Sequence, residues 1–320
     1  MRPTFLKPVY DGYFADPFAW TYAGQYYAIG TGEGEAQGHP GERIFPLLHS
    51  TNFKNWIFSG HALSQPDPRL GKSFWAPEVA FQDGTFYLFY SVGFGDTKHQ
   101  LRVATSKTPL GPYQDCGTGL TSLQDCPFAI DASPFRDDDG RWYLFFARDY
   151  LDAGNGRAGT GLAVGPLKTM TELGEPSPVL RARHDWQRFQ ADRPIYGAIY
   201  DWHTIEGPCV VKRQGRYYCF YSAGRWENET YGVDYAVADH VLGPYSDVGN
   251  ETGPRVLRTV PGQLIGPGHN SIMVGPDGRD WIVYHAWDPA MTARRMFVQP
   301  LAWTPTGPRV PRDPASGRSE

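Results

Sequence analysis

Apolar and polar residues alternate along most of the chain in short runs that are rich in aromatic residues. Glycine, proline and aspartate separate these runs, and no window keeps apolar residues at the spacing of an amphipathic helix. Two-residue alternation bounded by turn residues is typical of β-strands. The pattern therefore predicts an all-β protein made of short strands and tight turns.

One pattern, a turn glycine followed by an aromatic-rich strand, occurs five times. A short apolar strand precedes each glycine, and most copies have another strand afterwards, so each unit is a small antiparallel meander. Meanders that cannot bury both faces alone pack radially on one another. We therefore predict a five-bladed β-propeller with four-stranded blades and no accessory β-sandwich. The glycines and their runs are Gly24 with YYAIGTG, Gly84 with FYLFYSV, Gly140 with WYLFFAR, Gly215 with YYCFYSA and Gly278 with DWIVYHA.

We expect one propeller domain over residues 1–311 and a disordered tail over 312–320. Two longer stretches lie between the repeats. Residues 149–161 are polar and rich in glycine, which predicts a surface loop. Residues 181–205 are rich in aromatic side chains, Trp202 among them, and either wall a pocket or pack on a blade.

The first strand of each propeller blade lines the central channel, so residues at its start converge near the axis. Trp75, Asp131, Glu206 and His269 stand nine residues before their turn glycines, and Asp16 stands eight before the first. Three carboxylates at one apolar mouth repel one another and are costly to desolvate, which favours a functional site over a structural one. Two carboxyls of different ionisation can cleave a glycosidic bond, one protonating the leaving oxygen and the other activating water. A third carboxyl, when ionised, would raise the pKa of the acid. Trp75 suits the apolar face of a sugar, although a strand tryptophan is more often a core residue.

Composition narrows the choice of partners. The chain has 320 residues and a formal net charge of −4, which argues against a nucleic-acid partner. No apolar stretch reaches the roughly 18 residues of a membrane span, and the start lacks the apolar run of a signal peptide, so we expect a cytoplasmic protein without a membrane partner. Secretion stays open as the alternative if a leader has been removed. The sequence does not predict an oligomeric state.

The four cysteines do not have the spacing of a zinc site, and we expect them to be reduced packing residues. Cys209 and Cys219 are symmetric about Gln214 in an expected hairpin. We therefore expect these two side chains to face each other across it. The other two are Cys116 and Cys126.

Five runs of the chain resemble the signatures of glycoside hydrolase family 43, in the order in which that family has them. They are ADPFAW at 15–20, FWAPEV at 74–79, IDASPFRDDDG at 130–140, IEGP at 205–208 and GPGHNS at 266–271. The resemblance implies a five-bladed propeller that hydrolyses arabinose- or xylose-containing glycans with inversion. It also implies that Asp16 is the general base, Glu206 the general acid, and Asp131 the residue that tunes and orients the acid.

The run RRMFVQPLAW resembles the family's last blade, from which an arginine reaches the sugar. Arg294 and Arg295 point to opposite faces of a strand, and we favour Arg295. In family members with a channel metal, the histidine at the position of His269 helps to hold a hydrated calcium ion. A calcium ion contacted by His269 through water and a core histidine without a metal both remain open, and the acid–base chemistry requires no cofactor. The aspartates at 137–139 are better explained by a solvated hairpin turn than by a metal site.

The leading hypothesis is an α-L-arabinofuranosidase or exo-arabinanase acting on an oligosaccharide or polysaccharide, with a β-xylosidase next. Trp75, Trp202, His269 and Arg295 are its candidate sugar-binding residues. The aromatic stretch at 181–205 would close one end of the channel and favour release of single sugars. The alternatives are an endo-arabinanase, a fructan hydrolase of the related five-bladed family, and a sugar-binding propeller without catalysis.

Overall fold

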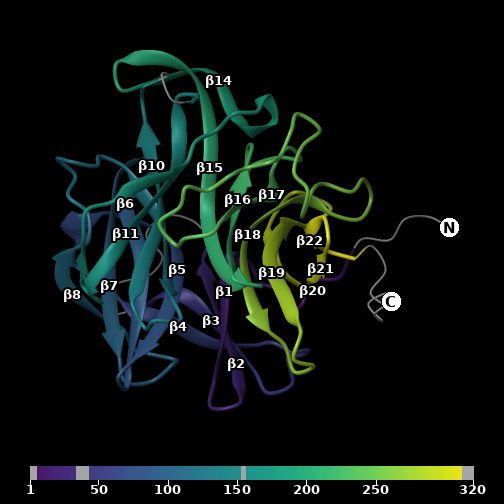
Figure 1. Ribbon diagram of the computed structural model, residues 1–320. Helices are drawn as coiled ribbons and strands as arrows, with labels where there is room; N and C mark the ends of the chain where they lie inside the picture. Colours follow the sequence, from purple (N-terminus) through teal and green to yellow (C-terminus); the bar gives the residue numbers. More distant parts are fainter. Residues whose placement is uncertain (1–5, 34–42, 153–155, 312–320) are drawn as a thin grey trace.

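The computed structural model describes residues 6–33, 43–152 and 156–311, and within them the regular structure is nearly all β-sheet (Figure 1). Blade 1 contains β1 (Ala15–Tyr22), β2 (Gln25–Thr31), β3 (Arg43–Ser50) and β4 (Ile57–Ser64). Blade 2 contains β5 (Ser73–Gln82), β6 (Thr85–Phe94), β7 (Thr97–Ser106) and β8 (Gln114–Gly119). Blade 3 contains β9 (Ala129–Arg136), β10 (Trp142–Tyr150), β11 (Gly159–Thr169) and β13 (Ser177–Leu180), with the short β12 (Glu172–Leu173) against β11.

The last two blades have three strands each within the described residues. Blade 4 contains β15 (Ala198–Arg213), β16 (Arg216–Ala223) and β17 (Gly232–Ala238), and isolated bridges from Val237 to Ser246 and from Val233 to Leu257 take the place of the predicted fourth strand. Blade 5 contains β18 (Ile265–Val274), β19 (Asp280–Trp287) and β20 (Arg294–Pro300), followed by the hairpin of β21 (Ala302–Thr304) and β22 (Gly307–Arg309). Two 3₁₀ turns, η1 (Pro68–Leu70) and η2 (Asp185–Gln187), are the helical elements of the described residues.

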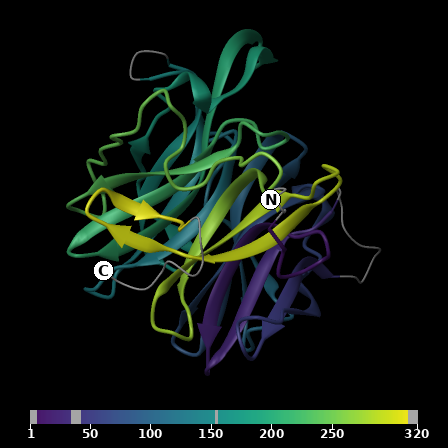
Figure 2. The same ribbon diagram turned by 90° about the vertical axis from the view of Figure 1, so that its right-hand side faces the viewer.

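The predicted five-bladed propeller is confirmed, and the N-terminal segment closes its ring. The backbone N–H of Val9 donates to the carbonyl of Met296 at 2.9 Å, and that of Phe14 donates to Arg294 at 2.9 Å. Figure 2 shows this purple segment beside the yellow strands of the last blade. Residues 312–320, where a disordered tail is predicted, lie outside the described part, as do 153–155 of the predicted surface loop. None of the described helical elements is long and apolar enough to cross a membrane.

A hairpin interrupts the passage from blade 3 to blade 4. Strand β14 (Arg188–Ile195) pairs antiparallel with the first half of the long β15, and both views show this hairpin at one end of the molecule (Figures 1 and 2). Beyond the hairpin, β15 also pairs in parallel with β11 through Gly159 and Thr160. The stretch predicted at 181–205 is therefore part of the β-structure that joins two blades.

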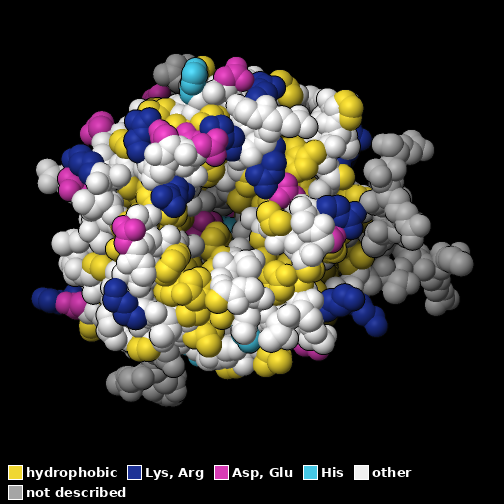
Figure 3. All heavy atoms as spheres, turned by 60° about the horizontal axis from the view of Figure 1, so that its bottom comes forward, with side chains coloured by type: hydrophobic (Ala, Val, Ile, Leu, Met, Phe, Trp, Pro, Cys, Tyr) yellow, Lys and Arg dark blue, Asp and Glu magenta, His cyan; other side chains and the backbone are white. Residues whose placement is uncertain are grey.

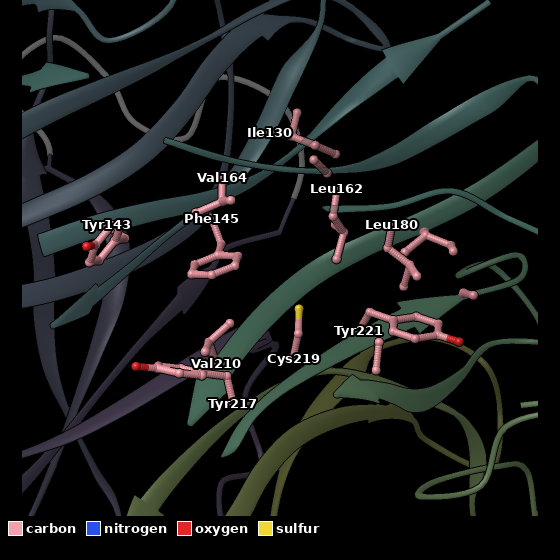
Figure 4. Close-up of a cluster of buried hydrophobic side chains, with 14 of the residues drawn as sticks. Ile130, Tyr143, Phe145, Leu162, Val164, Leu180, Val210, Tyr217, Cys219 and Tyr221 are labelled. Carbon is pink, nitrogen blue, oxygen red and sulfur yellow. The ribbon is translucent and has the colours of Figure 1, made fainter. Parts of the chain in front are cut away.

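Apolar side chains fill the space between neighbouring blades. The cluster in Figure 4 joins blades 3 and 4, and Phe145, Leu162 and Cys219 in it are fully buried. Cys219 pairs with Val210 across the hairpin, whereas Cys209 pairs with Phe220 and packs in a separate cluster. The expectation that the two cysteines face each other is wrong. Each cysteine is paired with the neighbour of the other, and neighbouring residues of a strand point to opposite faces. All four cysteines are free thiols, as predicted.

Each of the five inner strands carries an irregularity in its pairing, near the start of β1, β5 and β9 and near the middle of β15 and β18. The pairing register of β1, β5, β9, β15 and β18 is interrupted there, and one residue beside each interruption has a left-handed φ between 48° and 60°. Such a bulge bends the strand and re-aims its side chains. The left-handed residues are Asp16, Ala76, Asp131, Gly207 and His269.

Neighbouring blades are linked at these bulges by a repeated hydrogen bond. In three blades the side chain seven residues after the turn glycine accepts the backbone N–H of the bulge in the next blade. These bonds are Ala76 N to Thr31 Oγ1 at 2.9 Å, His269 N to Ser222 Oγ at 2.7 Å and Asp16 N to His285 Nδ1 at 3.0 Å. In blade 3 that position is Ala147, which has no acceptor, and Gly207 N donates instead to Asp131 Oδ2 at 2.8 Å.

Candidate active site

A cavity of about 420 Å³ opens where the inner strands begin. Volumes of this size are typical of small-molecule sites. The five residues found by counting back from the turn glycines all line it, so the structure brings them together as predicted. They are Asp16, Trp75, Asp131, Glu206 and His269.

The count from the glycines nevertheless misaligns the blades by one residue. Asp131 and His269 occupy the left-handed bulge position itself, whereas Glu206 precedes its bulge residue, Gly207. Glu206 is therefore structurally equivalent to Trp75 and not to Asp131. The reason is that Gly140 and Gly278 stand nine residues after their bulges, whereas the other turn glycines stand eight after theirs.

The carboxylate of Asp16 is buried among basic side chains. Its Oδ1 lies 3.4 Å from each of His269 Nδ1, His285 Nδ1 and Arg294 Nη1. Burial alone would raise the pKa of Asp16, but these three neighbours outweigh it and hold the pKa well below its usual range. Burial also lowers the pKa of both histidines, so Arg294 carries the lasting positive charge beside Asp16. Asp16 is consequently an ionised carboxylate across the neutral range.

Glu206 has the opposite ionisation. Burial raises its pKa to about 7, and the negative charge of Asp16 adds to this shift. The hydroxyl of Tyr231 donates to Glu206 Oε1 at 2.6 Å, which favours the ionised form and limits the shift. Glu206 is therefore a carboxyl that can hold a proton near neutral pH while Asp16 cannot.

Asp131 lies next to Glu206 through the backbone. Its carboxylate accepts the N–H of Gly207, the residue that follows Glu206. Burial, followed by the charges of Glu206 and Asp16, raises the pKa of Asp131 well above its usual range. Since carboxylates this close do not both ionise readily, Asp131 and Glu206 compete for one proton.

Arg294, and not Arg295, reaches the cavity. Its Nε donates to the hydroxyl of Tyr13 at 2.9 Å, and its guanidinium lies 4.5 Å from the ring centre of Trp226. Arg295 points to the other face of β20, where it pairs with Asp288 at 3.3 Å. The choice of Arg295 is therefore wrong, because the strand's phase in the sheet turns the neighbouring arginine inward.

Trp75 forms one wall of the cavity and is supported from behind. Its ring stacks on that of His99 with the centroids 4.0 Å apart and an interplanar angle of 21°. His99 is fully buried, and its Nε2 lies 2.7 Å from the carbonyl oxygen of Gly95. Burial lowers the pKa of His99 to about 4, so the ring behind Trp75 is neutral. This arrangement leaves Trp75 half-buried, with a face available to a sugar.

The hairpin of β14 and β15 walls the other side. Phe189, Arg193, Ile195 and Trp202 line the cavity, so this stretch forms a pocket wall as well as packing on the blades. Trp202 is only 1% exposed, and Arg193 lies over its ring at 5.3 Å. Trp202 thus supports the wall and offers little surface of its own.

Calcium prefers several oxygen ligands. Among the described residues no three His, Cys, Asp or Glu side chains are grouped to hold a metal ion. The amide of Asn270, next to His269, is buried with both its oxygen and its nitrogen unpaired, so it offers a single oxygen. These donors do not fit an ion held directly by the protein. A hydrated calcium ion beside His269 stays a prediction. The aspartates at 137–139 form the expected turn, in which Asp137 pairs with Lys212 at 3.1 Å.

Several cavity residues were missed by counting along the inner strands. Tyr13, Trp226 and Tyr231 lie in segments before or after strands, and Asp149 lies near the end of β10. A signal for most of them existed in the topology: the second strand of an antiparallel blade ends at the face where the first begins. Residues just after the aromatic runs therefore surround the same mouth.

Comparison with known proteins gives a consistent picture. A model of the glycosyl hydrolases family 43 matches residues 5–308. The chain is 30% identical to β-D-galactofuranosidase xynD from Aspergillus niger, in an alignment that covers 87% of this chain and 75% of the relative. It is 26% identical to extracellular endo-α-(1→5)-L-arabinanase 1 from Bacillus subtilis, in an alignment that covers 90% of this chain and 85% of the relative. The alignment with a solved structure of a thermostable family-43 glycoside hydrolase covers 99% of this chain and 98% of that one, with a TM-score of 0.79 and 28% identity. The arabinanase is named extracellular, which lends the cytoplasmic expectation no support.

Proposed function

The chain belongs to the glycosyl hydrolases family 43 and is a glycosidase, and from this premise we propose that it is an inverting enzyme that releases terminal α-L-arabinofuranosyl residues. The two relatives support a five-membered or arabinose-type sugar, because their names give a D-galactofuranoside and an L-arabinan as substrates. Terminal β-xylosyl groups are the second candidate. The family and its named activities disfavour both a fructan hydrolase and a non-catalytic sugar-binding module.

The observation that carries the proposal is the opposite ionisation of two carboxyls in one cavity. Asp16 is held ionised beside Arg294, while burial keeps the pKa of Glu206 about 7. Carboxyls whose environments separate their pKa values are the expected acid and base of a glycosidase. In the proposed reaction Glu206 protonates the leaving oxygen, and Asp16 removes a proton from a water that attacks the opposite side of the anomeric carbon.

Asp131 and Arg294 support these two residues. Asp131 competes with Glu206 for a proton, so an ionised Asp131 leaves that proton on Glu206, and its bond to Gly207 fixes the backbone beside the acid. The guanidinium of Arg294 keeps Asp16 deprotonated and is positioned by Tyr13 and Trp226. Trp75 offers an apolar face to the sugar ring.

The hairpin supports exo action. It borders the cavity on one side, and the ion pair of Arg193 with Asp96 at 3.0 Å joins it to the turn between β6 and β7. This contact bridges two blades beside the mouth. A closed side suits a chain end, whereas an endo enzyme needs a groove that is open at both ends. An endo-arabinanase is the alternative that this observation disfavours.

The proposal is tested with aryl α-L-arabinofuranoside, aryl β-D-xyloside, aryl β-D-galactofuranoside and linear arabinan. Glu206→Gln should lower turnover of linear arabinan, whose leaving oxygen needs a proton, by about 10²–10⁴-fold, the contribution of general acid catalysis. Glu172→Gln is the matched control, since Glu172 is exposed and lies outside the cavity. Wild-type protein that leaves all four substrates intact, or a Glu206→Gln variant that cleaves linear arabinan as fast as an active wild type, would refute the assignment.

Product analysis separates the finer alternatives. Exo action predicts a single sugar as the first product of linear arabinan, and a ladder of oligomers from the outset contradicts it. Inversion predicts that proton NMR detects the product first as the anomer opposite to the substrate.

A further inference from the structure

Part of the cavity is polar but contains none of the residues placed in the proposed reaction. Arg193 of β14 lies over the rings of Phe189 and Trp202 at 5.1 and 5.3 Å, and its Nη2 donates to Asp96 Oδ2 at 3.0 Å. Asp149, at the end of β10, lines the same region. Neither the acid–base step nor the binding of the cleaved sugar uses this group.

The region lies on the side of Glu206. Burial is the main cause of the raised pKa of Glu206, and the charge of Asp96 is among the contributions that raise it further. Asp149 pairs with Thr160 across β10 and β11, and Thr160 pairs with Thr204, two residues before Glu206 on β15. Because the general acid protonates the leaving oxygen, the leaving group must lie on the side of the acid. The group around Arg193 and Asp149 is thus placed to meet the leaving part of the substrate.

Asp149 has hydrogen-bonding capacity that the protein does not fill. Its Oδ1 accepts from Thr160 Oγ1 at 2.9 Å and its Oδ2 accepts from the hydroxyl of Tyr196 at 2.7 Å. An ionised carboxylate has about four acceptor positions. Burial raises the pKa of Asp149 to about 6, so it is ionised at neutral pH. A partly buried carboxylate facing a cavity is costly to a fold, and substrate hydroxyls would satisfy its remaining acceptor positions.

We propose that Asp149 binds hydroxyl groups of the leaving sugar and makes this side of the cavity a subsite for a neutral saccharide. The subsite rests on the proposed glycosidase function. The carboxylate of Asp149 accepts hydrogen bonds from the hydroxyls of a neutral sugar, whereas it would repel the carboxylate of a uronic acid.

The test compares two substrates that differ only in the leaving group, the aryl α-L-arabinofuranoside and α-1,5-linked arabinobiose. The nitrophenolate of the aryl substrate has no hydroxyls for Asp149 to bind. Asp149→Asn should therefore lower the ratio of kcat/KM for arabinobiose to kcat/KM for the aryl substrate about tenfold or more, the range for hydrogen bonds to a charged group. The ratio is independent of the fraction of protein that is correctly folded.

Two further variants separate binding from a structural role. Asp201→Asn makes the same chemical change at an exposed position of the same hairpin and should leave the ratio unchanged. Tyr196→Phe removes the bond that ties the hairpin to Asp149 but keeps the carboxylate. An unchanged ratio in Asp149→Asn, or an equal fall in Tyr196→Phe, would overturn the subsite while leaving the glycosidase assignment intact. Wild-type protein that cleaves neither substrate would refute the proposed function and the subsite with it.

Discussion

Replacing Tyr231 by phenylalanine should extend the activity of the protein to higher pH. The Tyr231 hydroxyl donates to Glu206 at 2.6 Å, and this bond stabilises the ionised carboxylate and lowers its pKa. Loss of this bond removes about 1.5–3 kcal/mol of stabilisation from the ionised carboxylate, the range for hydrogen bonds to charged groups. Since one pKa unit corresponds to about 1.4 kcal/mol, the pKa of Glu206 should rise by about one to two units from its value of about 7.

The assay is the pH dependence of kcat/KM, which reports the acid and base of the free enzyme. Activity requires Glu206 to be protonated, so the alkaline limb of the profile follows its pKa. In Tyr231→Phe the midpoint of this limb should move upward by about one unit or more. Tyr245→Phe is the matched control, because Tyr245 donates to the carbonyl of Val241 and does not line the cavity. A limb that stays in place or moves downward in Tyr231→Phe would refute the assignment of Glu206 as the acid.

Three other changes test the site and the fold. Arg294→Lys should lower kcat/KM at least about tenfold, because lysine lacks the planar fork that meets Asp16 and Tyr13, whereas Arg295→Lys should stay within about twofold in the same assay. Asp115→Ala should destabilise the protein by about 3–5 kcal/mol in urea unfolding, because the buried guanidinium of Arg102, which pairs with Asp115 at 2.5 Å, then has no carboxylate partner there. Phe145→Ala should cost about 3–5 kcal/mol in the same measurement, because it opens a cavity between blades 3 and 4.

The repeat made the fold and the centre of the site predictable. A turn glycine fixes where each inner strand ends, and strands of similar length then begin near the axis, which locates Asp16, Asp131 and Glu206. The position of each residue relative to the bulge of its inner strand was not predictable in this way. One extra residue between bulge and glycine in blades 3 and 5 shifts the count. The same limit applies to Arg294 and Arg295, because alternation separates their faces without saying which one is inward.

Residues outside the inner strands were harder to predict. Asp149 lines the cavity because β10 ends beside the mouth, and Tyr231 because the connection from β16 to β17 runs there. Arg193 lines it because a hairpin is inserted between blades 3 and 4. Topology indicates which segments surround the mouth. It does not give the path of a connection, which depends on contacts such as the ion pair of Arg193 with Asp96. Figure 3 views the molecule from the end opposite this hairpin and shows a hollow near the centre of that face.

Asp131 shows why site and architecture cannot be separated in this propeller. Four of the five bulge residues are not glycine, and a left-handed φ at such a residue costs about 1–3 kcal/mol unless its surroundings fix it. Hydrogen bonds from the preceding blade constrain three of these four bulges, at Asp16, Ala76 and His269. At the fifth bulge, Gly207, the regular acceptor is replaced by Ala147, and the carboxylate of Asp131 takes its place by binding Gly207 N. The carboxyl group that competes with Glu206 for a proton therefore also holds the backbone beside Glu206.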